Sequence, residues 1–440
     1  MKQAVILAGG EGTRLASRLN GLPKPLIDFC GHPLLWHQLG LLRRHGYTNV
    51  IILVGYRGEK ISEYLNTNSS WDMEIECISE LEPLGTAGAV LSIFHRLADT
   101  FLVVYGDTML DIDLIRFEKF HRSAGYRGVS LLVHPNNHPY DSDLVEVDPH
   151  NRVVNFHPYP HEPGSYYKNL VNAALYMIDR ESLSSFVKKK LNFRDFGKHI
   201  FPQMAEQGLP LRAYNSPEYI KDCGTPERLD GAIRDFNSGK IRYSNLNTPQ
   251  AAIFIDRDGT INKCAGHISD VKNLSLLEGV CDAIKLINDA GYRCILITNQ
   301  PVVARGECSL LGLSQIHNKL ECLLGVKNSF IDRIYFCPHH PDTGFENEVV
   351  SLKVPCGCRK PGIGMLKQAQ KDLNIDLQRS WFIGDTTVDM QTAKNAGVKS
   401  VLVQTGEAGM DGKYNVDPDY VSPNLLSAVK HVLFMDQKFS

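Results

Sequence analysis

The sequence has no surplus of charge of either sign and no long hydrophobic run. Its 440 residues include 47 lysines and arginines against 49 aspartates and glutamates, a net charge of −2. This balance speaks against a chain that binds nucleic acid or an anionic membrane through bulk charge. No stretch of about 20 apolar residues is present to span a membrane, and the apolar start AVILAG reaches glycines too soon for a secretory signal. The sequence therefore predicts a cytoplasmic protein whose partners are small molecules, with neither nucleic acid nor membrane among them.

Cysteine is too sparse and too scattered for a disulfide framework. The eleven cysteines are an odd number spread over a long chain, which is typical of reduced thiols in an intracellular protein. A tight group of cysteine and histidine residues in such a chain therefore predicts a metal site. Internal repeats are absent as well, and nothing in the sequence indicates an oligomeric state.

Short apolar runs alternate with amphipathic segments in both halves of the chain. This alternation is typical of α/β folds with parallel strands, and 440 residues are enough for two or three domains. In the first half we expect strands over 4–9, 49–55, 101–107 and 129–134, and helices over 34–45, 59–66, 86–97 and 113–124. In the second half we expect strands over 251–256, 293–298, 331–336, 380–385 and 400–405, and a final helix over 423–434.

A polar stretch, FNSGKIRYSNLNTPQ (236–250), separates the two halves and has no apolar period. Its Ser, Asn, Gly and Pro residues are typical of a linker. The sequence therefore predicts an α/β domain over 1–235, a linker over 236–250 and a second α/β domain over 251–440. Both domains are expected to be Rossmann-like.

The first expected strand runs into a glycine-rich turn, LAGGEGTR (7–14). Glycines let backbone N–H groups approach a phosphate, a helix N-terminus favours anions, and Arg14 can hold a phosphate through two hydrogen bonds. The segment LPKPLI (22–27) then fixes Lys24 between two prolines. These features predict a phosphate-binding site in the first domain.

Three later segments add polar residues to that site. EPLGTAGA (82–89) is a second loop where glycine permits close approach to a flat ligand. The strand FLVVYGD ends at Asp107, at the edge where open α/β sheets hold their ligands. IKDCGTPERL (220–229) supplies Asp222 just before a helix-like segment. Each feature alone is a common turn or helix cap, and the ordered set favours a site.

This ordered set resembles the sugar-1-phosphate nucleotidyltransferases over most of residues 1–235. By that resemblance Lys24 would steady the charge that builds up during transfer, Asn172 in VNAALYMID would contact the sugar, and Asp107 and Asp222 would hold Mg²⁺. The residues that would hold the nucleoside triphosphate are Leu7, Gly9, Gly10, Gly12, Thr13 and Arg14, with Gly85 and Thr86 against the base or sugar. The stretch FHPYPHEP (156–163) has no lysine where many members carry Glu-Lys-Pro. Either Lys168 replaces that lysine or the loop is rebuilt.

The second half begins with IFIDRDGT, which places Asp256 and Asp258 at a strand end. In extended chain, residues two apart point the same way, so one carboxylate can act as nucleophile on phosphorus and the other as general acid and base. Donors for phosphate oxygens follow at the ends of later segments: Thr298, Asn299, Arg359 and Lys360. WFIGDTTVDM (381–390) adds Asp385 and Asp389, acidic residues of the kind that gather around Mg²⁺.

These four motifs, in this order, resemble the haloacid dehalogenase-like phosphatases over 251–406. The resemblance implies that Asp256 forms an aspartyl-phosphate and that Asp258 protonates the leaving oxygen and then activates water. Thr298 and Lys360 would bind the phosphoryl group. Asp385 would hold Mg²⁺ with Asp256 and the carbonyl of Asp258, and Asp389 would support them.

FCPHHP (336–341) and PCGCRKP (355–361) place three cysteines and two histidines in two short segments. Three thiolates and one imidazole make a closed tetrahedral zinc site, which has a structural role because no ligand position stays open. The ligands would be Cys337, His339, Cys356 and Cys358. His340 is the competing imidazole, and family resemblance favours His339. The remaining eight cysteines are expected to be ordinary thiols.

The zinc loop resembles that of the heptose bisphosphate phosphatases and of the related histidinol-phosphate phosphatases. NQPVVARGE (299–307) is similar to the equivalent stretch in both, with Arg305 as a further phosphate-binding residue and Pro301 where a serine is usual. Together with similarity to the heptose-1-phosphate guanylyltransferases, this predicts two consecutive steps toward GDP-D-glycero-D-manno-heptose.

Three alternatives stay open at this point. The second domain could act on histidinol phosphate. The first domain could activate another hexose 1-phosphate, such as mannose or glucose, with another nucleotide. Either domain could be a nucleotide-sugar-binding module without catalysis, although the acidic residues that catalysis needs are all present.

Overall fold

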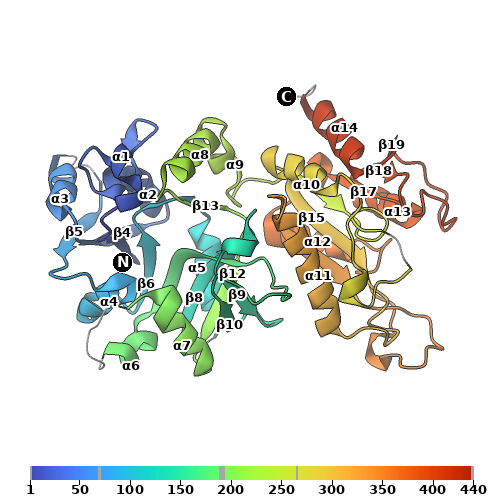
Figure 1. Cartoon of the computed structure of the whole chain (residues 1–440), viewed down its shortest axis with the longest axis horizontal. Coiled ribbons are helices and arrows are strands. Elements are labelled where there is room, and N and C mark those ends of the chain that lie inside the picture. Colours follow the sequence, from blue (N-terminus) through green and yellow to red (C-terminus); the bar gives the residue numbers. More distant parts are fainter. Residues whose placement is uncertain (1, 68–70, 126, 188–193, 264–265, 438–440) are drawn as a thin grey trace. The chain divides into compact units, whose positions relative to one another are not determined.

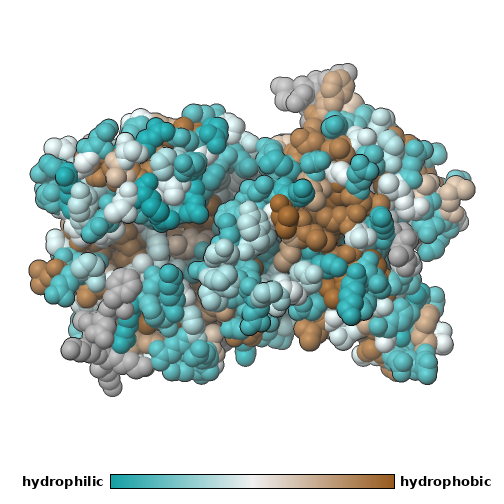
Figure 2. Space-filling model, viewed as in Figure 1, coloured by the Kyte–Doolittle hydropathy of each residue, from teal (hydrophilic) through white to brown (hydrophobic). Residues whose placement is uncertain are grey.

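The computed structural model describes residues 2–67, 71–125, 127–187, 194–263 and 266–437. Within these residues the chain forms two compact α/β units, which confirms the predicted fold class. No helix in the described part of the chain is both long and apolar enough to cross a membrane. On the face drawn in Figure 2, polar residues are interspersed with hydrophobic ones, and the largest hydrophobic area lies over the second unit.

The two units are interleaved along the chain. The first comprises Met1–His134, Val145–His157 and Asn172–Asn245, and the second comprises Pro135–Leu144, Pro158–Val171 and Leu246–Ser440. Two segments of the N-terminal half therefore pack with the C-terminal half. The stretch predicted as a linker contains helix α9 (Lys240–Tyr243), and Leu246 is buried in a core of the second unit.

The first unit is built on a mixed sheet with strand order β10-β9-β11-β6-β1-β4-β5, to which β8 and β12 add beside β11 (Figure 1). Its strands are β1 (Lys2–Ala8), β4 (Tyr47–Val54), β5 (Glu74–Ser79), β6 (Thr100–Tyr105), β8 (Val129–His134), β9 (Leu144–Val147), β10 (Val153–His157), β11 (Val171–Asp179) and β12 (Leu211–Asn215). β1 lies between β4 and β6 and is parallel to both. The residue after β1 therefore reaches the middle of the carboxyl edge of the sheet.

Two small sheets complete the strands of this unit: β2 (Asp28–Phe29) with β3 (His32–Pro33), and β7 (Thr108–Asp111) with β13 (Tyr219–Asp222). The helices are α1 (Ala16–Leu19), α2 (Leu34–Arg44), α3 (Gly58–Thr67), α4 (Gly85–Ser92), α5 (Leu114–Arg122), α6 (Ser184–Val187), α7 (Phe201–Glu206) and α8 (Pro226–Asn237). Alternate residues of β1, such as Ala4 and Ile6, share a core with Leu39 of α2 and Phe117 of α5. Helices α2 and α5 therefore pack on the face of the sheet to which these alternate residues of β1 point.

The second unit has a parallel sheet of order β16-β15-β14-β17-β18-β19. Its strands are β14 (Ala252–Ile255), β15 (Arg293–Asn299), β16 (Arg333–Cys337), β17 (Trp381–Gly384), β18 (Lys399–Val403) and β19 (Tyr420–Ser422). Its helices are α10 (Val280–Asp289), α11 (Leu310–Gly325), α12 (Gly364–Leu373), α13 (Thr387–Ala396) and α14 (Leu425–Gln437).

Both faces of this second sheet are buried. Ile253 and Ile255 pack in one core with residues of α10, α11 and α14, whereas Ala252 and Phe254 pack in another with residues of α12 and α13. Burial of each large apolar side chain stabilises the fold by about 1.5–3 kcal/mol. This explains why the strands read as continuous apolar runs, as parallel strands covered on both faces do.

Segment 158–171 binds helix α11 within the second unit. The Glu321 carboxylate of α11 is 6% exposed and accepts a hydrogen bond of 3.0 Å from the Asn169 backbone N–H. Asn318 Nδ2 donates to the Tyr166 carbonyl at 3.2 Å. A buried carboxylate without such donors is costly, so these bonds matter for the stability of the unit.

Candidate active sites

A cleft of about 340 Å³ opens at the carboxyl ends of β1, β5 and β6 in the first unit. Several of the predicted nucleotide-site residues line it: Leu7, Gly9, Gly10, Lys24, Gly85, Thr86 and Asp107. Ala8, Pro25, Glu80, Pro83, Ala89, Tyr105, Gly106 and Asp195 complete the lining. The structure thus brings the glycine-rich turn, the Lys24 loop and the end of β6 to one cleft.

Gly12 allows the lysine loop to cross the glycine-rich turn. Its φ is +70°, and a Cβ there would lie 2.8 Å from Cγ of Lys24 and from Cδ1 of Leu19. Any other residue would be strained and would displace Lys24. The sequence predicted Gly12 as a nucleotide contact, and the structure gives it this additional steric role.

Lys24 and Asp107 form an ion pair at the cleft. Lys24 Nζ lies 2.8 Å from Asp107 Oδ2, with the two side chains 16% and 27% exposed. Both are therefore shielded from water but reachable by a ligand in the cleft. A cation and a carboxylate side by side suit a triphosphate and the metal ion that accompanies it.

Asp222 reaches the neighbourhood of Asp107 through strand pairing. β13 runs antiparallel to β7, so Asp222 lies opposite Thr108, and the Cys223 N–H donates to the Asp107 carbonyl at 2.8 Å. The Asp222 carboxylate pairs with Arg228. Among the described residues, Asp107 and Asp222 belong to no group of three or more possible metal ligands.

Other predicted residues of the first unit lie beside the cleft lining or outside it. Thr13 and Arg14 are exposed in the turn after Gly12. Asn172 is half-buried at the start of β11, and its Nδ2 donates to the Tyr176 hydroxyl at 3.2 Å.

The sequence analysis missed three polar residues that line the cleft: Glu80, Tyr105 and Asp195. Thr86 Oγ1 donates to the Asp195 carboxylate at 2.8 Å, which ties the second glycine loop to residue 195. Glu80 follows β5, and β5 was not among the predicted strands because its residues alternate between charged and apolar without a long apolar run. Burial raises the pKa of Glu80, which the Leu84 N–H partly offsets.

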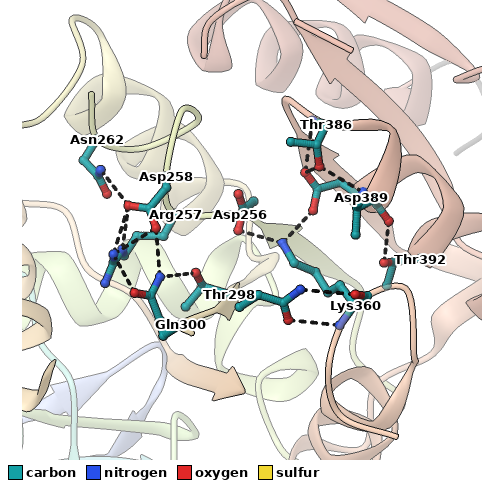
Figure 3. A network of polar contacts seen from close by, with 12 residues as sticks. Asp256, Arg257, Asp258, Asn262, Thr298, Gln300, Lys360, Thr386, Asp389 and Thr392 are labelled. Carbon is teal, nitrogen blue, oxygen red and sulfur yellow. Dashed lines mark hydrogen bonds and ion pairs between the residues drawn. The ribbon is translucent and has the colours of Figure 1, made fainter. Parts of the chain in front are cut away.

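The second site lies at the carboxyl edge of the sheet of the second unit (Figure 3). Asp256 follows β14, and Asp385 follows the neighbouring strand β17. Lys360 Nζ donates to Asp256 Oδ1 at 2.7 Å and to Asp389 Oδ1 at 2.6 Å. Four residues from three segments of the chain thus meet in one buried, charged cluster.

Asp256, Asp385 and Asp389 each offer an oxygen within 4.8 Å of the others. Burial and the neighbouring carboxylates raise the pKa of Asp256 to about 7, although Lys360 opposes this, and raise the pKa of Asp385 to about 8. Asp385 Oδ1 is buried and has no hydrogen-bond partner. A hard divalent cation fits this set, because it supplies the missing partner and offsets three adjacent negative charges. Asp389, expected only as support, thus joins the possible ligands.

The Asp258 side chain lies in a second network. It receives hydrogen bonds from Arg257, from Asn262 at 3.0 Å and from Gln300 at 2.8 Å. Figure 3 shows it turned to these three residues, while Lys360 links Asp256 to Asp389. The two aspartates predicted to share the chemistry are therefore held by different partners, and Arg257 and Gln300 are residues that the sequence analysis missed.

Thr298 and Asn299 follow each other at the end of β15. The Thr298 hydroxyl accepts from Gln300 Nε2 at 2.8 Å, whereas Asn299 exchanges two hydrogen bonds with the backbone of Lys360, at 3.0 and 3.2 Å. Asn299, expected as a phosphate donor, is thus occupied in fixing the segment that carries Lys360.

Cys337, His339, Cys356 and Cys358 also place their ligand atoms within 4.8 Å of one another. The three Sγ–Sγ distances are 3.5, 3.2 and 3.2 Å, and His339 Nδ1 lies 3.6 and 3.4 Å from two of the sulfurs. Tetrahedral zinc with bonds of about 2.3 Å to sulfur separates its ligands by about 3.8 Å. The four residues predicted as ligands, with His339 chosen over His340 by family resemblance, can therefore hold a metal ion.

Arg305 and Arg359 lie near this cluster. Arg305 Nη2 is 3.4 Å from His340 Nε2, and Arg359 Nη1 donates to the His339 carbonyl at 3.2 Å. Burial lowers the pKa of His340, as do the charges of Arg359 and Arg305, whereas Asp342, 3.7 Å away, opposes this. Two guanidinium groups near one loop could bind an anion.

Lys168, considered as a substitute for the missing lysine of the first domain, lies in segment 158–171 of the second unit. Burial lowers the pKa of Lys168, which Glu321 partly offsets.

Comparison with known proteins gives a separate result for each half. Residues 3–238 match the nucleotidyl transferase family, and residues 357–428 match the HAD-hydrolase-like family. A D-glycero-beta-D-manno-heptose-1,7-bisphosphate 7-phosphatase from Yersinia pestis is 41% identical over 158 residues, which are 36% of this chain and 81% of that protein. A D-glycero-D-manno-heptose-1,7-bisphosphate 7-phosphatase from Thermosynechococcus vestitus is 36% identical over 191 residues, 42% of this chain and 96% of that protein.

Two solved structures are also similar in part. HddC from Yersinia pseudotuberculosis has 25% identity and a TM-score of 0.46, covering 54% of this chain and 100% of that chain. A D,D-heptose 1,7-bisphosphate phosphatase from B. bronchiseptica has 29% identity and a TM-score of 0.38, covering 42% of this chain and 99% of that chain.

Proposed function

Because the chain belongs to the nucleotidyl transferase family and, in its C-terminal part, to the family of the heptose-1,7-bisphosphate 7-phosphatases, we propose that this bifunctional enzyme performs two consecutive steps. The first removes the 7-phosphate of D-glycero-D-manno-heptose 1,7-bisphosphate. The second joins the resulting heptose 1-phosphate to a nucleotide, with GTP as the donor. The observation that carries the proposal is the presence of both families in one chain, since the product of a heptose bisphosphate phosphatase is a sugar 1-phosphate, the class of substrate that a sugar nucleotidyltransferase uses.

For the phosphatase step, Asp256 is the nucleophile and Lys360 balances its charge. The Asp256 oxygen bonds to phosphorus while the bond from phosphorus to the sugar oxygen breaks, and Asp258 gives that oxygen a proton. Water then attacks the phosphoryl group, returns a proton to Asp258 and releases Asp256. Mg²⁺ held by Asp256, Asp385 and Asp389 would supply charge neutralisation for the phosphoryl oxygens.

The preference for a bisphosphate is supported by two separate groups of basic residues. Lys360 lies in the aspartate cluster, whereas Arg305 and Arg359 lie beside His339 and His340. The second group would bind the phosphate that is not cleaved. Zinc held by Cys337, His339, Cys356 and Cys358 would fix the loop that positions Arg359 and Lys360, a structural role.

For the transferase step, the cleft beside Gly9, Gly10 and Lys24 would hold the triphosphate. An oxygen of the heptose 1-phosphate attacks the α-phosphorus and pyrophosphate leaves, while Lys24 and Arg14 stabilise the developing charge. Mg²⁺ at Asp107 and Asp222 would supply further charge neutralisation.

The choice of GTP is supported by Glu80, which lines the same cleft. A carboxylate only accepts hydrogen bonds, and guanine presents two adjacent donors, N1–H and the 2-amino group. Uracil and thymine present one ring N–H between two carbonyl oxygens, which a carboxylate repels. Glu80 therefore suits guanine best among the common bases.

A coupled assay tests the proposal. The full chain with Mg²⁺ and either anomer of the heptose bisphosphate should release equal amounts of phosphate and pyrophosphate with GTP, and little pyrophosphate with ATP, CTP, UTP or dTTP. Histidinol phosphate and mannose 1-phosphate serve as competing substrates. Phosphate without pyrophosphate from any nucleotide would overturn the transferase assignment, and faster hydrolysis of histidinol phosphate would overturn the phosphatase assignment.

A further inference from the structure

Arg257, which lies between the two aspartates of the second site, takes no part in the chemistry described above. Its side chain is 0% exposed. It follows β14 by two residues, and its guanidinium group is turned to Asp258, whereas Asp256 is hydrogen-bonded to Lys360. A guanidinium buried in this way is very unfavourable unless its donors and its charge are matched.

Most of the N–H donors of Arg257, and its charge, are satisfied by neighbouring side chains. Nη2 donates to both oxygens of Asp258 at 2.9 Å, and Nε donates to Oδ1 at 3.1 Å. Nη2 also donates to Gln300 Oε1 at 2.9 Å, and Nη1 lies 3.3 Å from Nε2 of the buried His317. Asp258 is the only carboxylate among these partners, so it balances the buried charge.

These contacts allow Asp258 one orientation. The carboxylate also accepts from Asn262 and Gln300, so each oxygen carries at least two hydrogen bonds. Gln300 is fixed in turn by Arg257 and by the Thr298 hydroxyl. Figure 3 shows this closed ring of residues beside Asp256. A side chain held from several directions has little rotational freedom, so the Asp258 carboxylate is kept in one place.

We propose that Arg257 is a positioning residue of the phosphatase reaction, which holds Asp258 in the orientation for proton exchange with the leaving sugar oxygen. The inference rests on the proposed role of Asp258. The Arg257 side chain bonds to Asp258, Gln300 and His317, and Asp256 is not among these partners. Loss of Arg257 should therefore impair the reaction only where the leaving oxygen needs a proton.

Two phosphate esters distinguish this role from a structural one. Sugar alkoxides are poor leaving groups and need a proton, whereas p-nitrophenolate leaves without one. The ratio of their kcat/KM values reports the step up to departure of the leaving group, before water attacks. For Arg257→Met we expect kcat/KM to fall about 100-fold for the heptose bisphosphate and to stay within about 5-fold for p-nitrophenyl phosphate. Equal losses for both esters would overturn the proposal.

A double-mutant cycle tests whether Arg257 acts through Asp258. Adding Arg257→Met to Asp258→Asn should cause no further loss of kcat/KM for the heptose bisphosphate. This double variant has no unpaired buried charge, so it tests the proposal even if Arg257→Met alone fails to fold. Additive losses would overturn the proposal.

Two further variants change the network without removing it. Arg257→Lys keeps the charge but cannot hold both carboxylate oxygens in a plane, so the ratio of the two esters should be partly restored. Gln300→Met should change the ratio in the same direction as Arg257→Met, by about 10-fold. An unchanged ratio in both would contradict the proposal.

The assay also separates this inference from the proposed function. If the wild-type chain did not hydrolyse the heptose bisphosphate, the proposed substrate would be wrong. The comparison of a primary sugar phosphate with p-nitrophenyl phosphate would still report on Arg257. A normal wild-type rate with equal losses in the variant would instead leave the proposed function standing and remove the positioning role.

Discussion

At the scale of single residues, the two sites use charge in different ways. Lys24 forms one ion pair at the mouth of a cleft, whereas Lys360 lies between two buried aspartates. Burial acts to lower the pKa of Lys360, but Asp256 and Asp389 outweigh it and raise the pKa. Lys360 thus stays charged without substrate, and Lys24 is available to exchange Asp107 for a phosphate.

Single substitutions should separate the two activities. Asp256→Asn removes the nucleophile, so we expect phosphate release to fall at least about 1,000-fold while nucleotidyl transfer to supplied heptose 1-phosphate is retained. Lys24→Ala should lower nucleotidyl transfer by about 100-fold and leave phosphate release intact. Separate assays of phosphate and pyrophosphate check both. If each substitution silenced both activities, the sites would not be independent.

Glu80 should set both the base preference and a pH dependence. The ionised carboxylate accepts from guanine, and burial raises its pKa, so GTP affinity should weaken on acidification at a higher pH than an ordinary glutamate would cause. Glu80→Gln has no such titration, and its amide presents a donor and an acceptor as uracil requires. We expect this variant to change the ratio of GTP to UTP use by at least about 10-fold. Unchanged nucleotide preference and pH profile would exclude Glu80 from base recognition.

At the scale of elements, the sequence predicted most of what positions the sites. The expected strands and helices of both halves are present. Strands such as AIFI were predictable because their alternate residues are buried in two cores, which makes the whole strand an apolar run. The metal group at Cys337 was predictable because its ligands lie in two short segments. β5 was not predictable from an apolar run, and Glu80 was missed with it.

The remaining site residues depend on packing that no local pattern records. The contacts of Gln300 and Asn262 with Asp258 depend on the conformation of the turn that follows β14. Gly259 in that turn has φ +83°, and a Cβ there would lie 2.2 Å from Asp385 Oδ2. The contact joins two segments more than a hundred residues apart. The role of Asn299 depends likewise on the distant backbone of Lys360.

The cysteine-rich loop offers a prediction at this scale. Cys356→Ser should lower bound zinc, destabilise the second unit and reduce phosphate release through the displaced Lys360, with little effect on nucleotidyl transfer. Zinc analysis and thermal unfolding measure the first two effects. Cys281→Ser, on helix α10 and outside the group, is the matched control. Unchanged zinc content in Cys356→Ser would remove that residue from the ligand set.

At the scale of the whole molecule, the second unit includes two segments from the N-terminal half of the chain. Glu321 of α11 depends on one of them for the hydrogen bond from Asn169. A fragment starting at residue 246 would contain the phosphatase residues but would leave Glu321 without this donor. The functional domains predicted at 1–235 and 251–440 therefore need not be units of stability.

We expect the fragment 246–440 to unfold at a lower temperature than the same unit in the full chain. The hydrogen bond from the Asn169 N–H to the charged Glu321 carboxylate contributes about 1.5–3 kcal/mol in the full chain, so Glu321→Gln should cost stability there. In the fragment, where that bond is absent, the same substitution should change the stability little. Thermal unfolding of all four proteins measures the difference, and equal stability of fragment and full chain would show that segment 158–171 contributes nothing.

The interleaving also has a consequence in time. Asn169 and its partner Glu321 are 152 residues apart in the sequence. At roughly 5–20 residues per second, synthesis separates them by about 8–30 s. During that interval segment 158–171 has left the ribosome without the helix that receives it. The first unit must therefore begin to fold while segment 158–171 still lacks its partner. The second unit is complete only after helix α11 and the strands around it have been made.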